Sequence, residues 1–187
     1  HMYEDGGITP GEANASDGLR HFGASWDDLK QALKKSKPDI VGISNIFREN
    51  TNETIKAAQT IRSVLPNALI VCGGPNATAL PDFLLEEASG IDIIALGDGE
   101  DTMLELTEWI QGKRELDQVA SIVYRSSQGH TKTKSRNLRT DLDKLGHLNY
   151  NLLKLERYFT YERSGIMARN KFSYGGAERS VSLVTSR

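Results

Sequence analysis

One unit recurs along the first two thirds of the chain: a short apolar run, a short loop, and a stretch with helical periodicity. The apolar runs are Asp39–Ser44, Ala68–Gly74 and Asp92–Gly97. Runs of this length that are apolar throughout are typical of buried parallel strands. Since a parallel pair needs a crossover connection, the repeat predicts an α/β fold: a doubly wound, mostly parallel sheet with right-handed crossovers.

Helical stretches precede, separate and follow these runs. We expect a first helix that Ser25 caps, with Trp26, Leu29, Ala32 and Leu33 on its apolar face. We expect a second helix that Asn50 caps, with Glu53 three residues later, and that Pro66-Asn67 ends. A short helix near residues 81–88 and an amphipathic helix over Asp101–Ile110, closed by Gly112, complete the set.

The second part of the chain reads differently. Ser121–Arg125 and His130–Lys134 alternate around a Ser-Ser-Gln-Gly turn, which predicts an antiparallel hairpin. We therefore divide the chain into four parts. Residues 1–19 are a tag scar (His1-Met2) and a flexible lead-in, 20–118 the α/β domain, 119–140 a hairpin extension, and 141–187 an extended linker.

Composition narrows the class of protein. No apolar stretch approaches the roughly 18 residues of a membrane span, so we expect no membrane partner. Cys72 is the single cysteine of the 187 residues. An internal disulfide or a cysteine-rich metal site within this chain is therefore excluded, and a reducing cytoplasm is the expected compartment.

Charge is unevenly distributed. Residues 1–124 hold 10 Lys/Arg against 20 Asp/Glu, whereas residues 125–187 hold 13 against 5. A basic half can bind nucleic acid. Here the basic residues are dispersed and no aromatic platform for base stacking accompanies them. We therefore expect a solvated or domain-facing surface and no nucleic-acid partner.

Three small, polar loops follow the three apolar runs. Doubly wound sheets bind ligands at the carboxyl ends of their strands, near the point where the strand order reverses. Glycines there let a ligand approach the backbone, and hydroxyl groups offer hydrogen bonds. The candidate binding residues are Ser44, Asn45, Ile46, Phe47, Gly73, Gly74, Pro75, Asn76, Thr78, Gly97, Asp98, Gly99 and Glu100. The alternative is that Gly-Gly-Pro forms only a tight strand-to-helix turn.

Two of these loops carry a known spacing. Ser44-Asn45-Ile46 resembles a Ser-x-Leu element, and residues 47–72 separate it from Gly73-Gly74. This pattern resembles the cobalamin-binding domain shared by methionine synthase, the mutases and the cobalamin-dependent radical SAM enzymes. The resemblance implies a Rossmann-like fold that binds cobalamin. It also implies that Ser44 bonds the displaced dimethylbenzimidazole base, while Gly73 and Gly74 leave room for the nucleotide tail.

Further strings resemble the radical SAM branch of that family. The chain contains VCGGPNAT, GDGE, a hairpin and DLDKL in the order found there, and the closing SLVTSR resembles the first strand of the radical SAM barrel. The resemblance implies a parent enzyme, a methyltransferase or a cyclase-like enzyme. Its barrel would hold a four-iron–four-sulfur cluster and S-adenosylmethionine outside this chain. The iron–sulfur cysteines are not in this chain, so we expect it to be inert alone.

Two departures from the family pattern matter. No Asp-x-His-x-x-Gly motif is present, and Asn76 stands where the radical SAM strings often have histidine. The resemblance therefore implies cobalamin without its own base or a protein imidazole on cobalt. The family domain also begins with a strand, a helix and a second strand, which residues 3–24 are too polar and glycine-rich to supply. We expect a sheet that lacks these elements and exposes its edges.

Two other functions remain open. The chain could be a degenerate module that binds no corrinoid and serves as an interaction or substrate-gating domain of the same type of enzyme. A receiver-like signalling domain has a similar topology. Its acidic cluster and phosphoryl-accepting aspartate have no counterpart in this sequence.

Overall fold

The computed structural model describes residues 24–88, 90–137 and 149–152. The chain divides into two compact units, residues 1–137 and 138–187. In the second unit the described residues form one 3-10 turn, Tyr150–Leu152. Everything that follows concerns the first unit.

Five strands form one sheet in the order β1-β2-β3-β4-β5. They are β1 (Ile40–Ser44), β2 (Leu69–Gly73), β3 (Ile93–Ala95), β4 (Ile122–Ser126) and β5 (Gly129–Lys132). The first three strands are parallel, and β4 pairs antiparallel with both β3 and β5. The predicted α/β fold and hairpin are confirmed. Because β4 pairs with β3, the hairpin continues the main sheet. The described strands follow sequence order and contain no reversal, contrary to the expected switch point.

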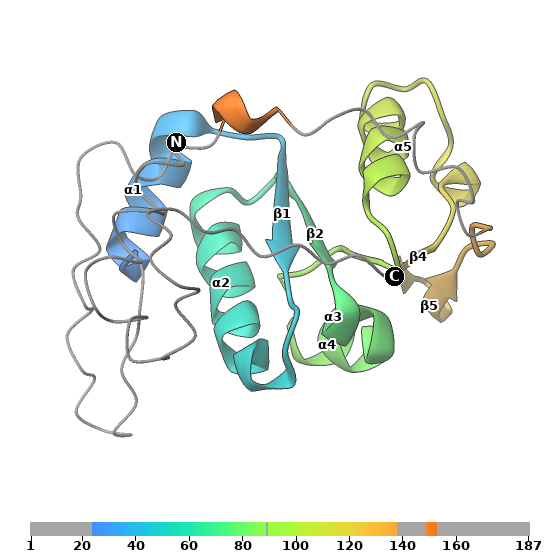
Figure 1. Ribbon diagram of the computed structural model, residues 1–187, viewed down its shortest axis with the longest axis horizontal. Helices are drawn as coiled ribbons and strands as arrows, with labels where there is room; N and C mark the ends of the chain where they lie inside the picture. Colours follow the sequence, from blue (N-terminus) through green and yellow to red (C-terminus); the bar gives the residue numbers. More distant parts are fainter. Residues whose placement is uncertain (1–23, 89, 138–148, 153–187) are drawn as a thin grey trace, which may run out of the picture. The chain divides into compact units, whose positions relative to one another are not determined.

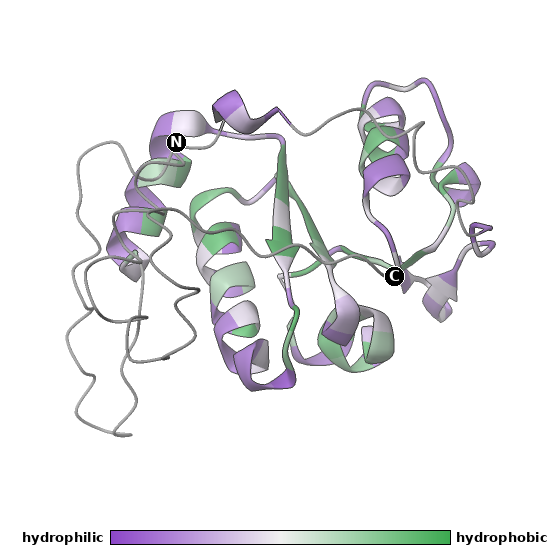
Figure 2. Cartoon of the chain, in the orientation of Figure 1, coloured by the Kyte–Doolittle hydropathy of each residue, from purple (hydrophilic) through white to green (hydrophobic). Residues whose placement is uncertain are grey.

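Helices cover both faces of this sheet (Figure 1). They are α1 (Trp26–Ser36), α2 (Thr51–Val64), α3 (Pro75–Ala79), α4 (Pro81–Glu87) and α5 (Glu100–Ile110). One apolar core packs the four helices α1, α2, α3 and α4 on one face of the sheet. The strands contribute Ile70, Cys72 and Ile94 to this core, among others. A second core packs Leu106 of α5 on the opposite face, against Val71. Figure 2 shows the apolar strands between helices whose outer surfaces are polar.

Strand β1 lies at the edge of the sheet and is only partly covered. Val41 and Ile43 pack toward α2, but Gly42 and Ser44, which alternate with them, are exposed. The prediction of a fully buried strand is therefore wrong for β1. None of the described residues covers the face that Gly42 and Ser44 share, or pairs with the outer edge of β1.

The helix starts depart from the sequence expectation in one place. Ser25 caps α1 through a capping box with Asp28, as predicted. Asn50 makes no side-chain cap bond to α2, so that prediction is wrong. A 3-10 turn, Arg48–Asn50, leads into the helix and leaves Asn50 at φ −89°, ψ 7°. A capping side chain needs an extended backbone to reach the free N–H groups.

Helix α3 was not predicted. It starts directly after Gly74, with Pro75 at its first position, where proline has no N–H to leave unsatisfied. The predicted helix near residues 81–88 is α4, and α3 precedes it with only Leu80 between them. Residues 75–79, expected as loop, therefore present a short helix to the strand ends. No helix among the described residues is long and apolar enough to cross a membrane.

Candidate functional site

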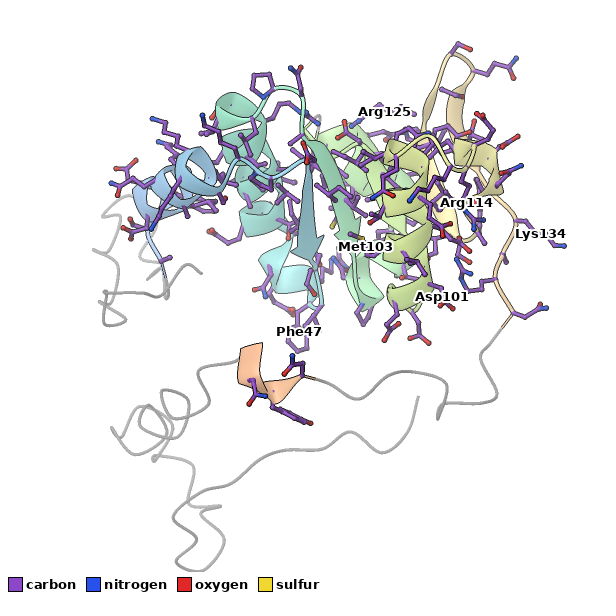
Figure 3. The ribbon with its side chains drawn as sticks, turned by 90° about the horizontal axis from the view of Figure 1, so that it is seen from above. Phe47, Asp101, Met103, Arg114, Arg125 and Lys134 are labelled. Carbon is purple, nitrogen blue, oxygen red and sulfur yellow. The ribbon has the colours of Figure 1, made fainter. Side chains whose placement is uncertain are left out.

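The first and second candidate loops are direct neighbours. In the register of β1 and β2, Ser44 lies opposite Gly73. The two positions that the sequence singled out 29 residues apart are thus adjacent at the carboxyl ends of parallel strands. In Figure 3, Phe47 of the first loop and Asp101 at the start of α5 lie on the same side of the molecule, at these strand ends.

Backbone hydrogen bonds tie the three loops together. The N–H of Asn45 donates to the carbonyl of Gly73 at 2.8 Å, and the N–H of Asn76 donates to the carbonyl of Asn45 at 3.2 Å. The third loop is joined through Thr78, whose hydroxyl oxygen accepts a hydrogen bond of 3.0 Å from the N–H of Gly97. Each loop therefore holds the next in place.

A buried cluster of amides and hydroxyls lies beneath the first two loops. Asn45 is fully buried, and its side-chain nitrogen donates to the hydroxyl of Thr54 at 2.8 Å. The side-chain nitrogen of Asn76 donates to Asn45 Oδ1 at 2.8 Å and to the hydroxyl of Thr51 at 3.1 Å. The two amides that the sequence placed among the ligand contacts are bonded to each other and to α2.

Gly74 is required by the protein itself. Its φ is +103°, and a Cβ there would lie 2.6 Å from the carbonyl oxygen of Asn45. A side chain at this position would therefore clash with the first loop and strain the backbone. For this glycine the tight-turn interpretation accounts for the residue without any ligand.

Two other glycines have no such explanation. A Cβ on Gly73 would meet only Ala95, at an ordinary 3.7 Å, and a Cβ on Gly99 would meet nothing within 4 Å. Neither adopts a positive φ. A third glycine, Gly42, lies two residues before Ser44 on β1, and a Cβ on it would also meet nothing within 4 Å. Glycine inside a strand weakens it, and often marks a place where a ligand or another backbone approaches closely.

The rim of the site is apolar on one side and acidic on the other. Ile46 and Phe47 have 50% and 61% of their surface exposed, which is unusual for adjacent large apolar residues. Asp98 and Glu100 are exposed next to the start of α5, where the helix dipole stabilises carboxylates. Pro75 is exposed at the head of α3.

The sequence analysis did not predict a role for Thr51 and Thr54 at the candidate site. They lie three residues apart, so both face the same side of the first turn of α2. Threonines at the start of a helix that follows a candidate loop were the available signal. Gly42 was also passed over, although a glycine inside an apolar run is a recognisable irregularity.

One cavity, of about 470 Å³, lies at the opposite, amino ends of the strands. Arg62 and Asp92 border it and form an ion pair of 2.6 Å. Arg62 also donates to the carbonyls of Pro66, Ala68 and Gly90, so both terminal nitrogens of its guanidinium help tie α2 to the sheet. This cavity does not border the candidate site. Among the described residues, no group of three or more His, Cys, Asp or Glu side chains is placed to hold a metal ion.

The model of the B12 binding domain matches residues 13–107, which is about half of the chain, and the chain belongs to that family. The fold is that of the cobalamin-binding domain of a cobalamin-dependent radical SAM enzyme.

The curated relatives include a methyltransferase and a cyclase. The chain is 28% identical over 134 residues to the uncharacterised methyltransferase PH0819 of Pyrococcus horikoshii, covering 72% of this chain and 29% of the relative. It is 30% identical over 158 residues to the anaerobic magnesium-protoporphyrin IX monomethyl ester cyclase of Rubrivivax gelatinosus, covering 81% and 28%.

A solved structure confirms the fold. The cobalamin-dependent S-adenosylmethionine radical enzyme OxsB, with aqua-cobalamin and S-adenosylmethionine bound, superposes with a TM-score of 0.56 at 21% identity. The match covers 62% of this chain and 16% of OxsB. The chain therefore spans less than a third of the proteins it resembles.

Proposed function

We propose that this domain binds cobalamin across the carboxyl ends of β1, β2 and β3, with the nucleotide tail in the slot between Ser44 and Gly73. The observation that carries the proposal is the register that sets Ser44 opposite Gly73. Ser44 offers a hydroxyl, and Gly73 leaves space that no protein packing demands. The uncovered face of β1, with Gly42 below Ser44, continues this slot down the sheet.

The rim suits the rest of such a ligand. Ile46 and Phe47 supply an exposed apolar surface for the corrin ring, and burying it would be favourable. The far side of the strand ends would be lined by Thr78, Gly97 and Gly99. Pro75 would lie between these residues and the apolar pair Ile46 and Phe47. Asp98 and Glu100 can accept hydrogen bonds from amide groups at the ring periphery, and their charge disfavours a phosphate in contact with them.

The lower face of the cobalt would carry no protein imidazole from the described residues. His130 is the histidine among them, and it pairs with Asp82 at 2.9 Å on the hairpin. Asn76 already uses both of its side-chain N–H groups within the protein. We therefore propose base-off cobalamin, in which the dimethylbenzimidazole base would not be bonded to cobalt and would instead be held by a hydrogen bond to Ser44.

In the parent enzyme this domain would present cobalamin to a radical SAM barrel of the same chain. The corrinoid would supply a transferable methyl group, while the barrel would hold S-adenosylmethionine and a four-iron–four-sulfur cluster. We propose methyl transfer as the reaction and the cytoplasm as the compartment. The relation to PH0819 supports the first. The buried thiol of Cys72 suits the second.

The test is a titration of the protein with hydroxocobalamin, followed by visible absorbance and gel filtration. We expect one cobalamin per chain to be retained with a base-off spectrum. Ser44→Leu should abolish retention, because the leucine would fill the slot while lying on an exposed face. Lys132→Leu is the matched control, an exposed strand residue on β5, and should bind as the wild type does.

Two results would overturn the proposal. Retention of cobalamin by Ser44→Leu at wild-type affinity would show that the ligand lies elsewhere. A folded wild-type chain that retains none would favour a degenerate interaction or gating module.

A further inference from the structure

We infer that Asn45 and Asn76 are positioning residues, which hold the cofactor loops in register from below, and do not themselves touch the cofactor. This inference rests on the proposed function and revises the expectation that both amides line the ligand. The cluster they form with Thr51 and Thr54 is here called the amide latch.

The latch is closed on itself. Asn76 spends both of its N–H groups on Asn45 and Thr51, and Asn45 donates to Thr54. Thr54 in turn donates to the carbonyl of Asn50 at 3.0 Å, and Thr51 to that of Arg48 at 2.6 Å. Every link therefore ends on the backbone of the turn that opens α2.

Burial separates three of the four latch residues from any ligand, and Thr51 is half-buried. Asn45 has no exposed surface, Thr54 has 5% and Asn76 has 9%. The flanking residues Ser44 and Ile46 are exposed, so the chain alternates between one side chain turned outward and one turned into the protein. A buried amide loses more by giving up its protein partners than an exposed one, because water cannot replace them.

The latch and the glycine turn fix each other. The carbonyl of Asn45 accepts a hydrogen bond from the N–H of Asn76, and its oxygen lies 2.6 Å from the position that a Cβ of residue 74 would take. The close approach of the first two loops thus depends both on Gly74 and on the bonded amides of Asn45 and Asn76. Through Thr78, on the same short helix as Asn76, the third loop follows. The spacing of all three loops is set before a ligand arrives.

The first test measures coupling. In Asn45→Ala and Asn76→Ala, hydroxocobalamin affinity should fall by roughly three- to tenfold each, the range of one buried hydrogen bond. The double variant should lose less affinity than the sum of the two single losses, because both variants remove the shared Asn45–Asn76 bond, while each also removes one bond of its own, to Thr54 or to Thr51. The bound absorption spectrum should stay as in the wild type. Additive losses, or a changed spectrum, would show direct contact and overturn the inference.

The second test asks whether a residue that cannot reach the ligand acts through Asn45. Thr54→Val should weaken cobalamin binding, while Thr60→Val, two turns further along α2, should not. Val119→Ala serves as a stability control, since Val119 is fully buried in the second core, which does not include α2. It should lower the unfolding temperature without lowering affinity. Equal affinity loss in Val119→Ala would reduce the latch to general stability.

A readout without ligand separates this inference from the proposed function. In the free protein, Asn76→Ala should speed hydrogen exchange of the backbone N–H groups of residues 45 and 97. If the wild type binds no cobalamin but this exchange changes, the proposed function fails and the latch stands. If exchange is unaffected, the latch is overturned whatever the chain binds.

Discussion

At the scale of single residues, Gly73 and Gly74 are adjacent but have different roles. Gly74 has a positive φ and is crowded by the carbonyl of Asn45, whereas a Cβ on Gly73 would meet only ordinary contacts. The sequence indicated both glycines as candidate binding residues but did not distinguish their roles. A glycine that the protein's own packing requires cannot be told from one that it does not require until the position of the opposite loop is known.

This difference gives a paired prediction. Gly73→Ala should keep the free energy of unfolding near that of the wild type and weaken cobalamin binding at least tenfold. Gly74→Ala should lower the unfolding free energy by about 1–3 kcal/mol, the usual magnitude of backbone strain. Urea denaturation and hydroxocobalamin titration measure the two quantities. A Gly73→Ala protein that binds normally would show that no ligand enters this slot.

Cys72 gives a second prediction at this scale. It is fully buried in the core beside α2, and burial raises the pKa of its thiol to about 11. The thiol should therefore stay protonated at neutral pH and resist a thiol-reactive dye in the native protein. In urea the same cysteine should react fully. Rapid labelling of the native chain would contradict the described core.

At the scale of elements, an ion pair ties the segment after the hairpin to α5. Burial pushes the pKa of Glu105 up, but hydrogen bonds from Arg136 and from the N–H of Ala120, with the charges of Arg136 and Arg114, hold it below its usual value. Arg136 donates to Glu105 at 2.6 Å and 3.0 Å. The hydrogen bond to Glu105 raises the pKa of Arg136 in return.

The sign of the pH effect follows. A carboxylate whose pKa is lower in the folded state stabilises the protein above its unfolded pKa, about 4.3, and loses that effect as the pH falls. Glu105→Gln should therefore cost more stability at pH 7 than at pH 3, as measured by urea denaturation. Arg136→Gln should narrow the same difference. An equal loss at both pH values would assign Glu105 a role in packing alone.

Elements also show how far the sequence could lead. The apolar runs and the Ser25 cap predicted the strands and α1 because their signals are local. Helix α3 was missed because a run of Pro-Asn-Ala-Thr-Ala after two glycines reads as a loop. The Asn50 cap failed because the preceding 3-10 turn depends on contacts that Thr51 and Thr54 make with residues outside the helix.

At the scale of the whole molecule, the site is distributed over loops that only the sheet brings together. The sequence could place Ser44 and Gly73 at strand ends, but their register depends on the long-range pairing of β1 with β2. The inward turn of Asn45 and Asn76 was equally hidden, since an amide in a polar loop carries no sign of burial. The place of these residues at the strand ends was predictable, but the contacts of their side chains were not.

Ligand binding should act on the stability of the whole unit. A ligand that binds the folded state alone stabilises it by about 2.7 kcal/mol at 100 times its dissociation constant. Hydroxocobalamin at that concentration should raise the unfolding free energy of the wild type by this amount, measured by urea denaturation with circular dichroism. Ser44→Leu should show no increase. An equal increase in both would indicate binding outside the slot.

Helix α3 is hydrogen-bonded to the first loop through Asn76 and to the third loop through Thr78, and this has a consequence for kinetics. Loops already locked together have no rearrangement to complete after the encounter. The protein should thus add no slow phase of its own to association, and any slow phase seen on mixing should match the release of the dimethylbenzimidazole base from cobalt in the ligand. The site would then be preformed, and on the protein's side the association rate would be limited only by the encounter with the ligand and by the ligand's orientation.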